Sequence, residues 1–237
     1  MTELRYAAQD FARHWGEQGP RAAFAYLWEI LRAQVYLEED EIVVHKDFDP
    51  DAAPEPGPVR LELAQAHDLP MLAEFNRRQD NATRTRRFET GFAEGRQALV
   101  GFRDGELIGY FWFHDASVRS GDCYVSRYGI RLGEGEVYGE DLFIAPEHRG
   151  RGIPAAFVAA LEAELLRLGY HRMYGFVDAF NTPARWLWTT SGYTVVTRRH
   201  THRILRRFVI VEDEGRRHEV RDVVRPLRAI GFSGRRD

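Results

Sequence analysis

"DLFIAPEHRGRGIPAAFVAALEAELLRLG", residues 141–169, passes from an apolar strand through a loop of arginines and glycines into an amphipathic helix. Apolar residues recur in the helical part every three or four positions, which indicates one buried face. These residues are Ile153, Phe157, Leu161, Leu165 and Leu168. Proline is favoured in the first helical turn, because its missing N–H would have no partner within the helix there. Pro154 therefore predicts that the helix begins close to residue 153.

The loop itself has the features of an anion site. A helix N-terminus exposes N–H groups and a partial positive charge, and glycines ahead of it let a bulky anion approach the backbone. Two arginines add charge. The candidate residues for a phosphate or pyrophosphate are Arg149, Gly150, Arg151, Gly152 and Ile153.

A dinucleotide-binding fold is the first rival interpretation, because Gly150-x-Gly152-x-x-Ala155 satisfies the loose glycine fingerprint. That fingerprint requires a tight turn directly after the strand and an acidic residue about 20 positions further on. Here residues 146–149 intervene, and Asp178 lies too far along the chain. The pattern therefore disfavours this rival.

The order of the remaining elements predicts an α/β fold. Asp104-Gly105 between the apolar runs "QALVGFR" and "ELIGYFWFH" predicts a hairpin. Further strands are expected at 41–46, 59–64, 123–131, 137–145, 171–177, 193–200 and 206–212, and helices at 8–17, 21–33, 67–78, 83–94, 153–168 and 182–190. The Pro- and Asp-rich stretch at 47–58 suits a boundary. We therefore expect an appendage at 1–58, a main domain at 59–200 and a basic strand and tail at 201–237.

Composition sets limits on the class of protein. The chain has 237 residues, of which 44% are hydrophobic, enough for a substantial core. No apolar run approaches the roughly 18 residues of a membrane span, and the first residues lack the pattern of a secretory signal, so a cytoplasmic protein is expected. Cys123 is the only cysteine, which excludes an intramolecular disulfide and a cysteine-based zinc cluster.

Charge is distributed unevenly around a net value of −3. Residues 198–237 hold 12 arginines against 6 acidic residues. The acids are interspersed and no aromatic stacking pattern accompanies the arginines, so nucleic-acid binding is not expected. His200 and His202 share one strand face, but spacing marks no third ligand, so no metal site is predicted.

Two motifs carry a family resemblance. "LFIAPEHRGRGI" resembles motif A of the GCN5-related N-acetyltransferases (GNAT), Arg/Gln-x-x-Gly-x-Gly/Ala, with Arg149, Gly152 and Pro154 at its positions. "DAFNTPARWLWTTSGY", residues 178–193, resembles the next motif, Asn-x-x-Ala-x-x-x-Tyr followed by Gly-Phe/Tyr, with Asn181 as its first residue. The two motifs in this order and spacing are more specific than either alone. The resemblance covers about residues 59–200.

The resemblance implies a fold and a cosubstrate. The fold would be a mixed, mostly antiparallel central sheet with splayed central strands flanked by helices, here with an N-terminal helical appendage. Acetyl-CoA would be the acyl donor, with its pyrophosphate on the loop and its pantetheine arm between the splayed strands. Asn181, a helix cap by its local sequence, would also position acetyl-CoA. Backbone groups of Leu142, Phe143 and Ile144 would bind the arm and polarise the thioester carbonyl.

Two positions depart from the family pattern. Pro154 removes one backbone donor from the phosphate site, which would either weaken the affinity or shift the phosphates toward the amides of Gly150 to Ile153. Trp188 stands where the family has a tyrosine that protonates the leaving thiolate, and an indole has no titratable proton to give. Water, Tyr193, Ser191 or no group at all remain the alternatives for this step.

A carboxylate is expected to take the proton from the attacking amine. "VYGEDLF" resembles the Glu-Asp element of diamine acetyltransferases, which assigns the base to Glu140, with Asp141 and Glu136 as alternatives. The predicted function is an N-acetyltransferase that acts on a primary amine of a small molecule by direct attack in a ternary complex. Two alternatives stay open, a non-catalytic CoA-binding module and an acyltransferase that takes its acyl group from an acyl-carrier protein. A homodimer also stays open.

Overall fold

The computed structural model describes residues 11–12, 15–16, 19–51, 57–79, 88, 90–118, 131–204, 207–212 and 217–221. Cys123 and nearly all of the strand predicted at 123–131 lie outside these residues, as does half of the predicted helix at 83–94, of which residues 88 and 90–93 are helical. The chain forms two compact units. The larger is Asp40–Arg198, and the smaller combines Met1–Glu39 with Arg199–Asp237.

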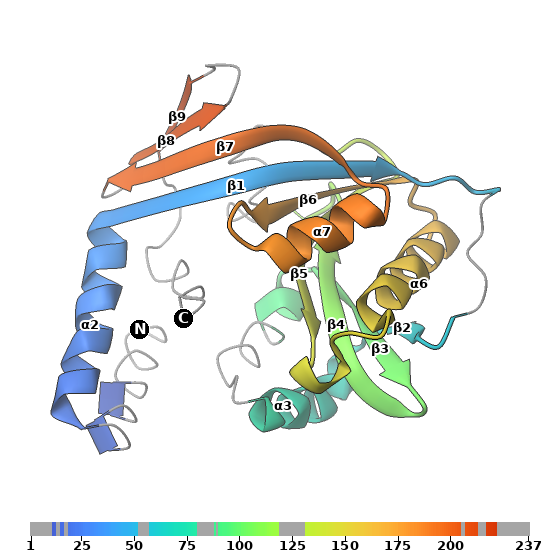
Figure 1. Cartoon of the computed structure of the whole chain (residues 1–237), viewed down its shortest axis with the longest axis horizontal. Helices are drawn as coiled ribbons and strands as arrows, with labels where there is room; N and C mark the ends of the chain where they lie inside the picture. Colours follow the sequence, from blue (N-terminus) through green and yellow to red (C-terminus); the bar gives the residue numbers. More distant parts are fainter. Residues whose placement is uncertain are drawn as a thin grey trace. The chain divides into compact units, whose positions relative to one another are not determined.

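The larger unit is built on a mixed sheet with the strand order β2-β3-β4-β5-β6-β1-β7 (Figure 1). The strands are β1 (Tyr36–Asp47), β2 (Arg60–Leu63), β3 (Gln97–Arg103), β4 (Glu106–His114), β5 (Glu136–Ile144), β6 (Arg172–Asp178) and β7 (Thr194–Ile204). Neighbours from β2 to β5 pair antiparallel, as do β6 and β1, whereas β5 and β6 pair parallel. This sheet confirms the fold class predicted from the sequence.

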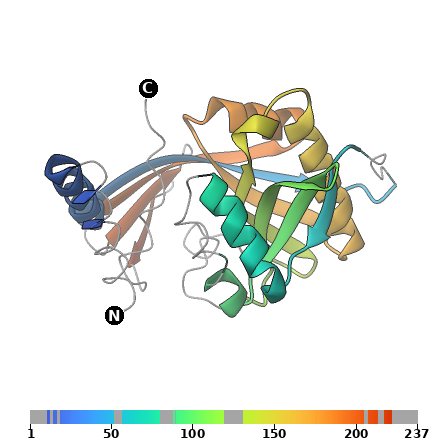
Figure 2. The ribbon, with the colours of Figure 1, turned by 90° about the horizontal axis from the view of Figure 1, so that it is seen from below.

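Helices cover both faces of the sheet (Figure 2). They are α3 (Leu69–Arg78) on one face, and α6 (Ile153–Arg167) and α7 (Thr182–Thr190) on the other. Two short 3-10 turns, η1 (Ala66–Asp68) and η2 (Pro146–His148), precede α3 and α6. Phe157 and Leu161 of α6 are fully buried among strand residues, as the helical periodicity predicts. Leu72 and Phe75 of α3 pack in a second core against Tyr110.

Strand β1 belongs to the sheet although its sequence precedes the Pro-rich stretch. It is longer than the predicted 41–46, and Glu41–Asp47 pair with β6 in antiparallel register. Ile42 and Val44 enter the same core as α6, because alternate strand residues share a face. The larger compact unit begins at Asp40, so most of β1 lies within it. The Pro-rich composition of residues 47–58 predicted an interruption of regular structure. The unit to which β1 belongs is decided by its pairing with β6.

The smaller unit contains α2 (Pro20–Val35), β8 (Arg207–Glu212) and β9 (Arg217–Arg221). β8 pairs antiparallel with β7 on one side and with β9 on the other. Arg199 and Glu212 face one another across the β7–β8 pair, and both side chains are buried. The tail beyond residue 221 lies outside the described residues.

Strands β4 and β5 approach closely at Gly109. A Cβ atom added at this glycine would lie 2.3 Å from the carbonyl oxygen of Phe143 on β5. That distance is far below van der Waals contact, and the obstructing atom is backbone, which cannot rotate away. Gly109 is therefore required for the close approach of the two strands.

We expect Gly109→Ala to destabilise the chain by about 1–3 kcal/mol, because the strands must separate to admit the methyl group. Gly175→Ala is the matched control on β6, where the nearest atom to an added Cβ is a Val44 methyl at 3.7 Å, an ordinary contact. Urea unfolding followed by tryptophan fluorescence measures both variants. Equal unfolding midpoints for the two would contradict this reading of the β4–β5 approach.

Candidate functional site

The loop before α6 holds three consecutive residues in the left-handed region. Gly150, Arg151 and Gly152 have φ values of 108°, 48° and 76°, and all three are exposed. Among the described residues, nothing accepts a hydrogen bond from their three N–H groups. A Cβ added at either glycine would meet no atom within 4 Å. The loop thus holds three exposed backbone donors in a row that have no acceptor among the described residues, as an anion-binding nest does.

Pro154 does not remove any of these donors. It is the second residue of α6, after Ile153, whose own N–H already donates to the Gly150 carbonyl at 3.0 Å. The departure from the family motif therefore leaves the amides of Gly150, Arg151 and Gly152 in place. The sequence predicted the Ile153 amide as a phosphate ligand. In the structure this amide bonds to the Gly150 carbonyl and closes the turn before α6.

Arg149 points back onto β5. Its Nε donates to the Ile144 carbonyl at 2.8 Å, and its guanidinium lies 5.6 Å from the centre of the Phe143 ring. The side chain thereby ties the loop to the end of the strand. Arg149 still places positive charge next to the loop, while the exposed Arg151 extends from its middle.

Strands β5 and β6 separate halfway along their length. Their parallel pairing runs from Glu136–Arg172 to Gly139–Gly175, and none is found beyond that level among the described residues (Figure 1). The rest of β5 stays paired with β4, as far as Gly109–Ile144. One edge of β5 therefore has no strand partner over residues 140–144, and we call this separation of β5 from β6 the gap.

The hydrogen-bonding pattern shows which backbone groups face this gap. Ala145 N–H donates to Ile108 O on β4 at 2.8 Å. Because bonded directions alternate along an antiparallel strand, Phe143 also faces β4, whereas Leu142 and Ile144 face the opening. Arg149 already occupies the Ile144 carbonyl. The Leu142 amide and carbonyl and the Ile144 amide are the groups directed into the gap.

Asn181 caps α7. Its Oδ1 accepts a hydrogen bond from Ala184 N–H at 3.1 Å, and the residue is exposed. The local sequence predicted this cap. Asn181 thus fixes where α7 begins, and through α7 it fixes Trp188, whose buried ring packs edge-on against Tyr193 at 4.7 Å between ring centroids.

Tyr193 is buried beneath α6, close to Glu162 and Met173. Burial raises the pKa of its hydroxyl well above the usual value, and the neighbouring Glu162 raises it further. Glu162 is paired with Lys46 at 2.7 Å, and burial raises the pKa of this carboxyl too. A buried phenol with a raised pKa is poorly suited to protonate a leaving thiolate, so Tyr193 fits a structural role.

Glu140 lies where β5 leaves β6. It is the extra residue of a β-bulge, because Asp141 pairs with Trp112 and Gly139 with Phe113. One carboxylate oxygen of Glu140 lies 2.6 Å from His114 Nδ1, and the other accepts a short hydrogen bond from Arg96. An ionised carboxylate only accepts hydrogen bonds, so His114 Nδ1 carries the hydrogen.

The surroundings of Glu140 keep it ionised. Burial alone would raise its pKa, but the hydrogen bond from His114 and the charge of Arg96 outweigh burial and leave the pKa below its usual value. His114 is almost fully buried and packs edge-on against Tyr138. The three side chains form a charged cluster on the face of the sheet opposite α6.

The other two candidate carboxylates lie elsewhere on β5. Glu136 is at the start of the strand, where it accepts hydrogen bonds from Gly133 N–H and from Arg172, at 2.7 and 2.8 Å. This position is within the paired part of β5 and β6, away from the gap. Asp141 is half-buried and directly follows the bulge. The structure therefore places Glu140 and Asp141 at the gap. Glu136 instead bonds to Arg172, so that it links the first residues of β5 and β6.

Comparison with known proteins identifies the family. The model of the acetyltransferase (GNAT) family matches residues 62–193, more than half of the chain. The chain belongs to the GNAT acetyltransferase family. Members of this family generally depend on acetyl-CoA. No curated protein sequence matches the chain.

Solved structures resemble the chain at low sequence identity. A GNAT-family protein from Novosphingobium aromaticivorans is 17% identical with a TM-score of 0.46, covering 70% of this chain and 63% of its own. A protein of unknown function from Staphylococcus epidermidis is 10% identical with a TM-score of 0.51, covering 75% and 65%. A Salmonella typhimurium protein solved with its cofactor acetyl-CoA is 20% identical with a TM-score of 0.40, covering 63% and 95%. The chain spans less than two thirds of the first two structures.

Sequence reasoning missed Arg96. This arginine follows Gly95 in the turn before β3, and its partner Glu140 lies on a strand 44 residues further along the chain. No motif marks it, because a single arginine after a glycine is common in surface turns. His114 was visible only as a polar residue at the end of an aromatic strand.

Among the described helices, none is long and apolar enough to cross a membrane.

We expect Glu140→Gln to lower the free energy of unfolding by on the order of 2 kcal/mol at neutral pH, because Arg96 loses one of its two carboxylate partners in a largely buried position and keeps only Glu94. The pKa of Glu140 is lowered in the folded state, so its contribution is present above the unfolded value of about 4.3 and is lost as pH falls through the folded value. Urea unfolding of the parent and of Glu140→Gln, from pH 7 down to pH 3, measures the difference in their free energies of unfolding. A stability difference that stays constant over this range would contradict the ionised cluster.

Proposed function

We propose that this GNAT acetyltransferase transfers an acetyl group from acetyl-CoA to a primary amine of a small molecule, by direct attack of the amine in a ternary complex. The observation that carries the proposal is the loop Gly150–Gly152 at the start of α6, whose three exposed residues have N–H groups without partners among the described residues. The gap between β5 and β6 supports it as the place for a long thiol arm.

The loop binds the pyrophosphate through its backbone. Gly150, Arg151 and Gly152 supply three N–H donors, and α6 adds the positive end of its dipole. Glycines at two of the three positions keep side chains out of the way of the phosphates. Arg149 holds the loop against β5 and adds charge beside it.

The gap binds the pantetheine arm and orients the thioester. Acetyl-CoA supplies the reactive acetyl group. The Leu142 amide and carbonyl and the Ile144 amide pair with the amide groups of the arm, as a neighbouring strand would. A fixed backbone N–H at this edge also polarises the thioester carbonyl, because a rigid donor needs no reorganisation as charge develops on the oxygen.

Glu140 acts as the general base that removes a proton from the acceptor amine. An alkyl ammonium group titrates near 10.4 in water, so most of the acceptor must lose a proton before its nitrogen can attack. Glu140 is ionised and stands at the gap, and it takes the proton directly or through a water molecule. Arg96 balances its charge, and His114 fixes the orientation of the carboxylate.

The bond changes balance without a general acid. The amine nitrogen bonds to the acetyl carbon, the carbon–sulfur bond breaks with its electron pair leaving on the sulfur, and the nitrogen gives up its second proton to water. A thiol of this kind titrates near 8.5, so its thiolate is an acceptable leaving group at neutral pH and takes its proton from water. Trp188, in the position of the family's tyrosine, fills the core beneath α7.

A thiol-release assay with acetyl-CoA and a panel of small primary amines tests the activity. Glu140→Gln should lower kcat/KM by about 100-fold near pH 7, and by much less near pH 10, where about a quarter of the amine is already neutral. Asp141→Asn, the adjacent carboxylate, should retain most of the activity. All assays are run below the unfolding temperature of each variant. Equal losses at both pH values would remove Glu140 as the base.

The same assay distinguishes the alternatives. A chain that binds CoA but releases thiol with no amine is a binding module, and the proposed function fails. Release from an acylated carrier protein, but not from acetyl-CoA, would assign a different donor.

Two positive-φ glycines at opposite ends of α6 test the phosphate site. Gly152→Ala and Gly169→Ala, at φ values of 76° and 92°, each strain the backbone by about 1 kcal/mol with open space around the new methyl. Only Gly152→Ala should weaken CoA binding, by at least about tenfold, because it alters the row of donors. Calorimetric titration with CoA measures both. Equal affinities for the two variants would place the pyrophosphate elsewhere.

A further inference from the structure

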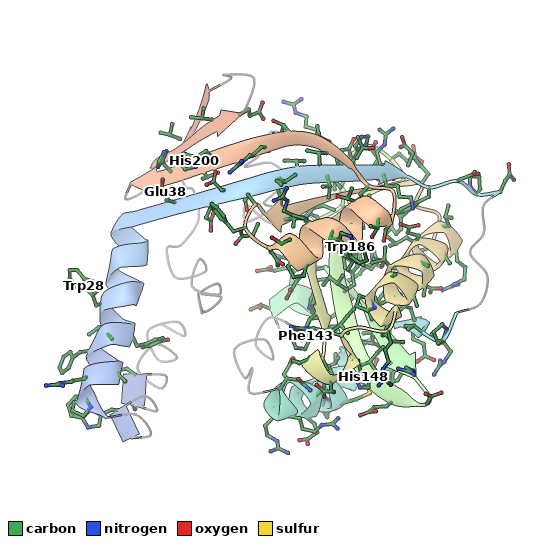
Figure 3. The ribbon with its side chains drawn as sticks, in the orientation of Figure 1. Trp28, Glu38, Phe143, His148, Trp186 and His200 are labelled. Atoms are coloured by element: carbon green, nitrogen blue, oxygen red, sulfur yellow. The ribbon has the colours of Figure 1, made fainter. Side chains whose placement is uncertain are left out.

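Glu38, His200 and His202 lie close together in the smaller unit. Figure 3 labels Glu38 and His200. His200 and His202 are two positions apart on β7, so their side chains share a face. Glu38 comes from β1, with its Oε1 3.2 Å from His200 Nε2 and 4.0 Å from His202 Nδ1. The three ligand atoms all lie within 4.8 Å of one another.

These separations suit a single small cation. Ligand atoms around a tetrahedral zinc ion, with bonds of about 2.0–2.1 Å, are about 3.3 Å apart. Small side-chain rotations bring all three atoms to that spacing, and the two imidazole rings already stand edge-to-face, 4.1 Å between centroids. Two imidazoles with one carboxylate favour zinc and its neighbours over calcium or magnesium, which prefer oxygen ligands.

The strands hold the two histidines on this face. Arg199 pairs with Glu212 across β7 and β8, and both side chains are buried on the opposite face, beside the buried Thr201. If β7 shifted by one residue against β8, the Arg199–Glu212 ion pair would move to the face that carries the histidines. Burial of this ion pair therefore fixes the register of the two strands. The two cross-strand neighbours of the histidines, Val209 and Val211, are apolar and offer no competing ligand.

We propose that Glu38, His200 and His202 bind one divalent transition-metal ion, for which Zn²⁺ is the probe. Three protein ligands leave one tetrahedral position for water. All three side chains are partly exposed, so the ion can enter from solvent. The bound ion joins β1 to β7 within the smaller unit. This site is independent of the acetyl-transfer proposal, because it shares no residue with it.

Calorimetric titration of zinc chloride into the full-length chain, without an affinity tag and freed of metal with EDTA, tests the site. We expect one ion per chain. Glu38→Gln, His200→Ala and His202→Ala should each weaken binding by at least about tenfold, since even indirect contacts to a metal contribute 10–100-fold to its affinity. Glu39→Gln and His67→Ala are matched controls that remove the same groups at positions outside the cluster, and should bind as the parent does.

Cobalt(II) gives a second readout that does not depend on stability. The parent chain should develop the visible absorption of a low-coordinate Co²⁺ ion with nitrogen ligands, and the His200→Ala/His202→Ala chain should not. Glu38→Gln changes a half-exposed surface residue, so it tests the site even if a histidine variant unfolds. The proposal is overturned if the parent binds no stoichiometric zinc, or if all three cluster variants bind as tightly as the two controls.

Discussion

The separation of β5 from β6 is the constraint on which the rest of the larger unit depends. Parallel strands normally stay hydrogen-bonded along their length, but here the ladder stops at Gly139 and Gly175. The bulge at Glu140 bends β5 at the same level, while close packing at Gly109 keeps the bent strand against β4. One backbone edge is thereby left open, which a soluble protein tolerates only where a ligand or water satisfies it.

The two ends of the gap have opposite electrical character. At one end, the amides of Gly150–Gly152, the α6 dipole and two arginines create a positive site. Near the other, Glu140 carries a negative charge that Arg96 and His114 stabilise. Under the proposed function, the positive site would hold the nucleotide thiol and the ionised Glu140 would face the amine.

Burial assigns structural roles to the polar residues that lie beneath α6 and α7. Lys46, Glu162 and Tyr193 form a network under α6 in which burial raises the pKa of both acidic groups. These groups hold β1 and the segment after α7 against the helix. Their chemistry resembles that of a catalytic set, but their position in the core separates them from the gap.

The sequence by itself determined the features that depend on local order. Periodicity and Pro154 fixed α6, Asp104-Gly105 fixed the β3–β4 hairpin, and the glycine loop indicated its exposed amides. Tertiary structure alone decided which distant residues meet: β1 beside β6, Arg96 on Glu140, and Glu38 on His200. Strand pairing and burial bring these residues together across long stretches of chain. No local spacing records such contacts, because their energy comes from a core that many segments build jointly.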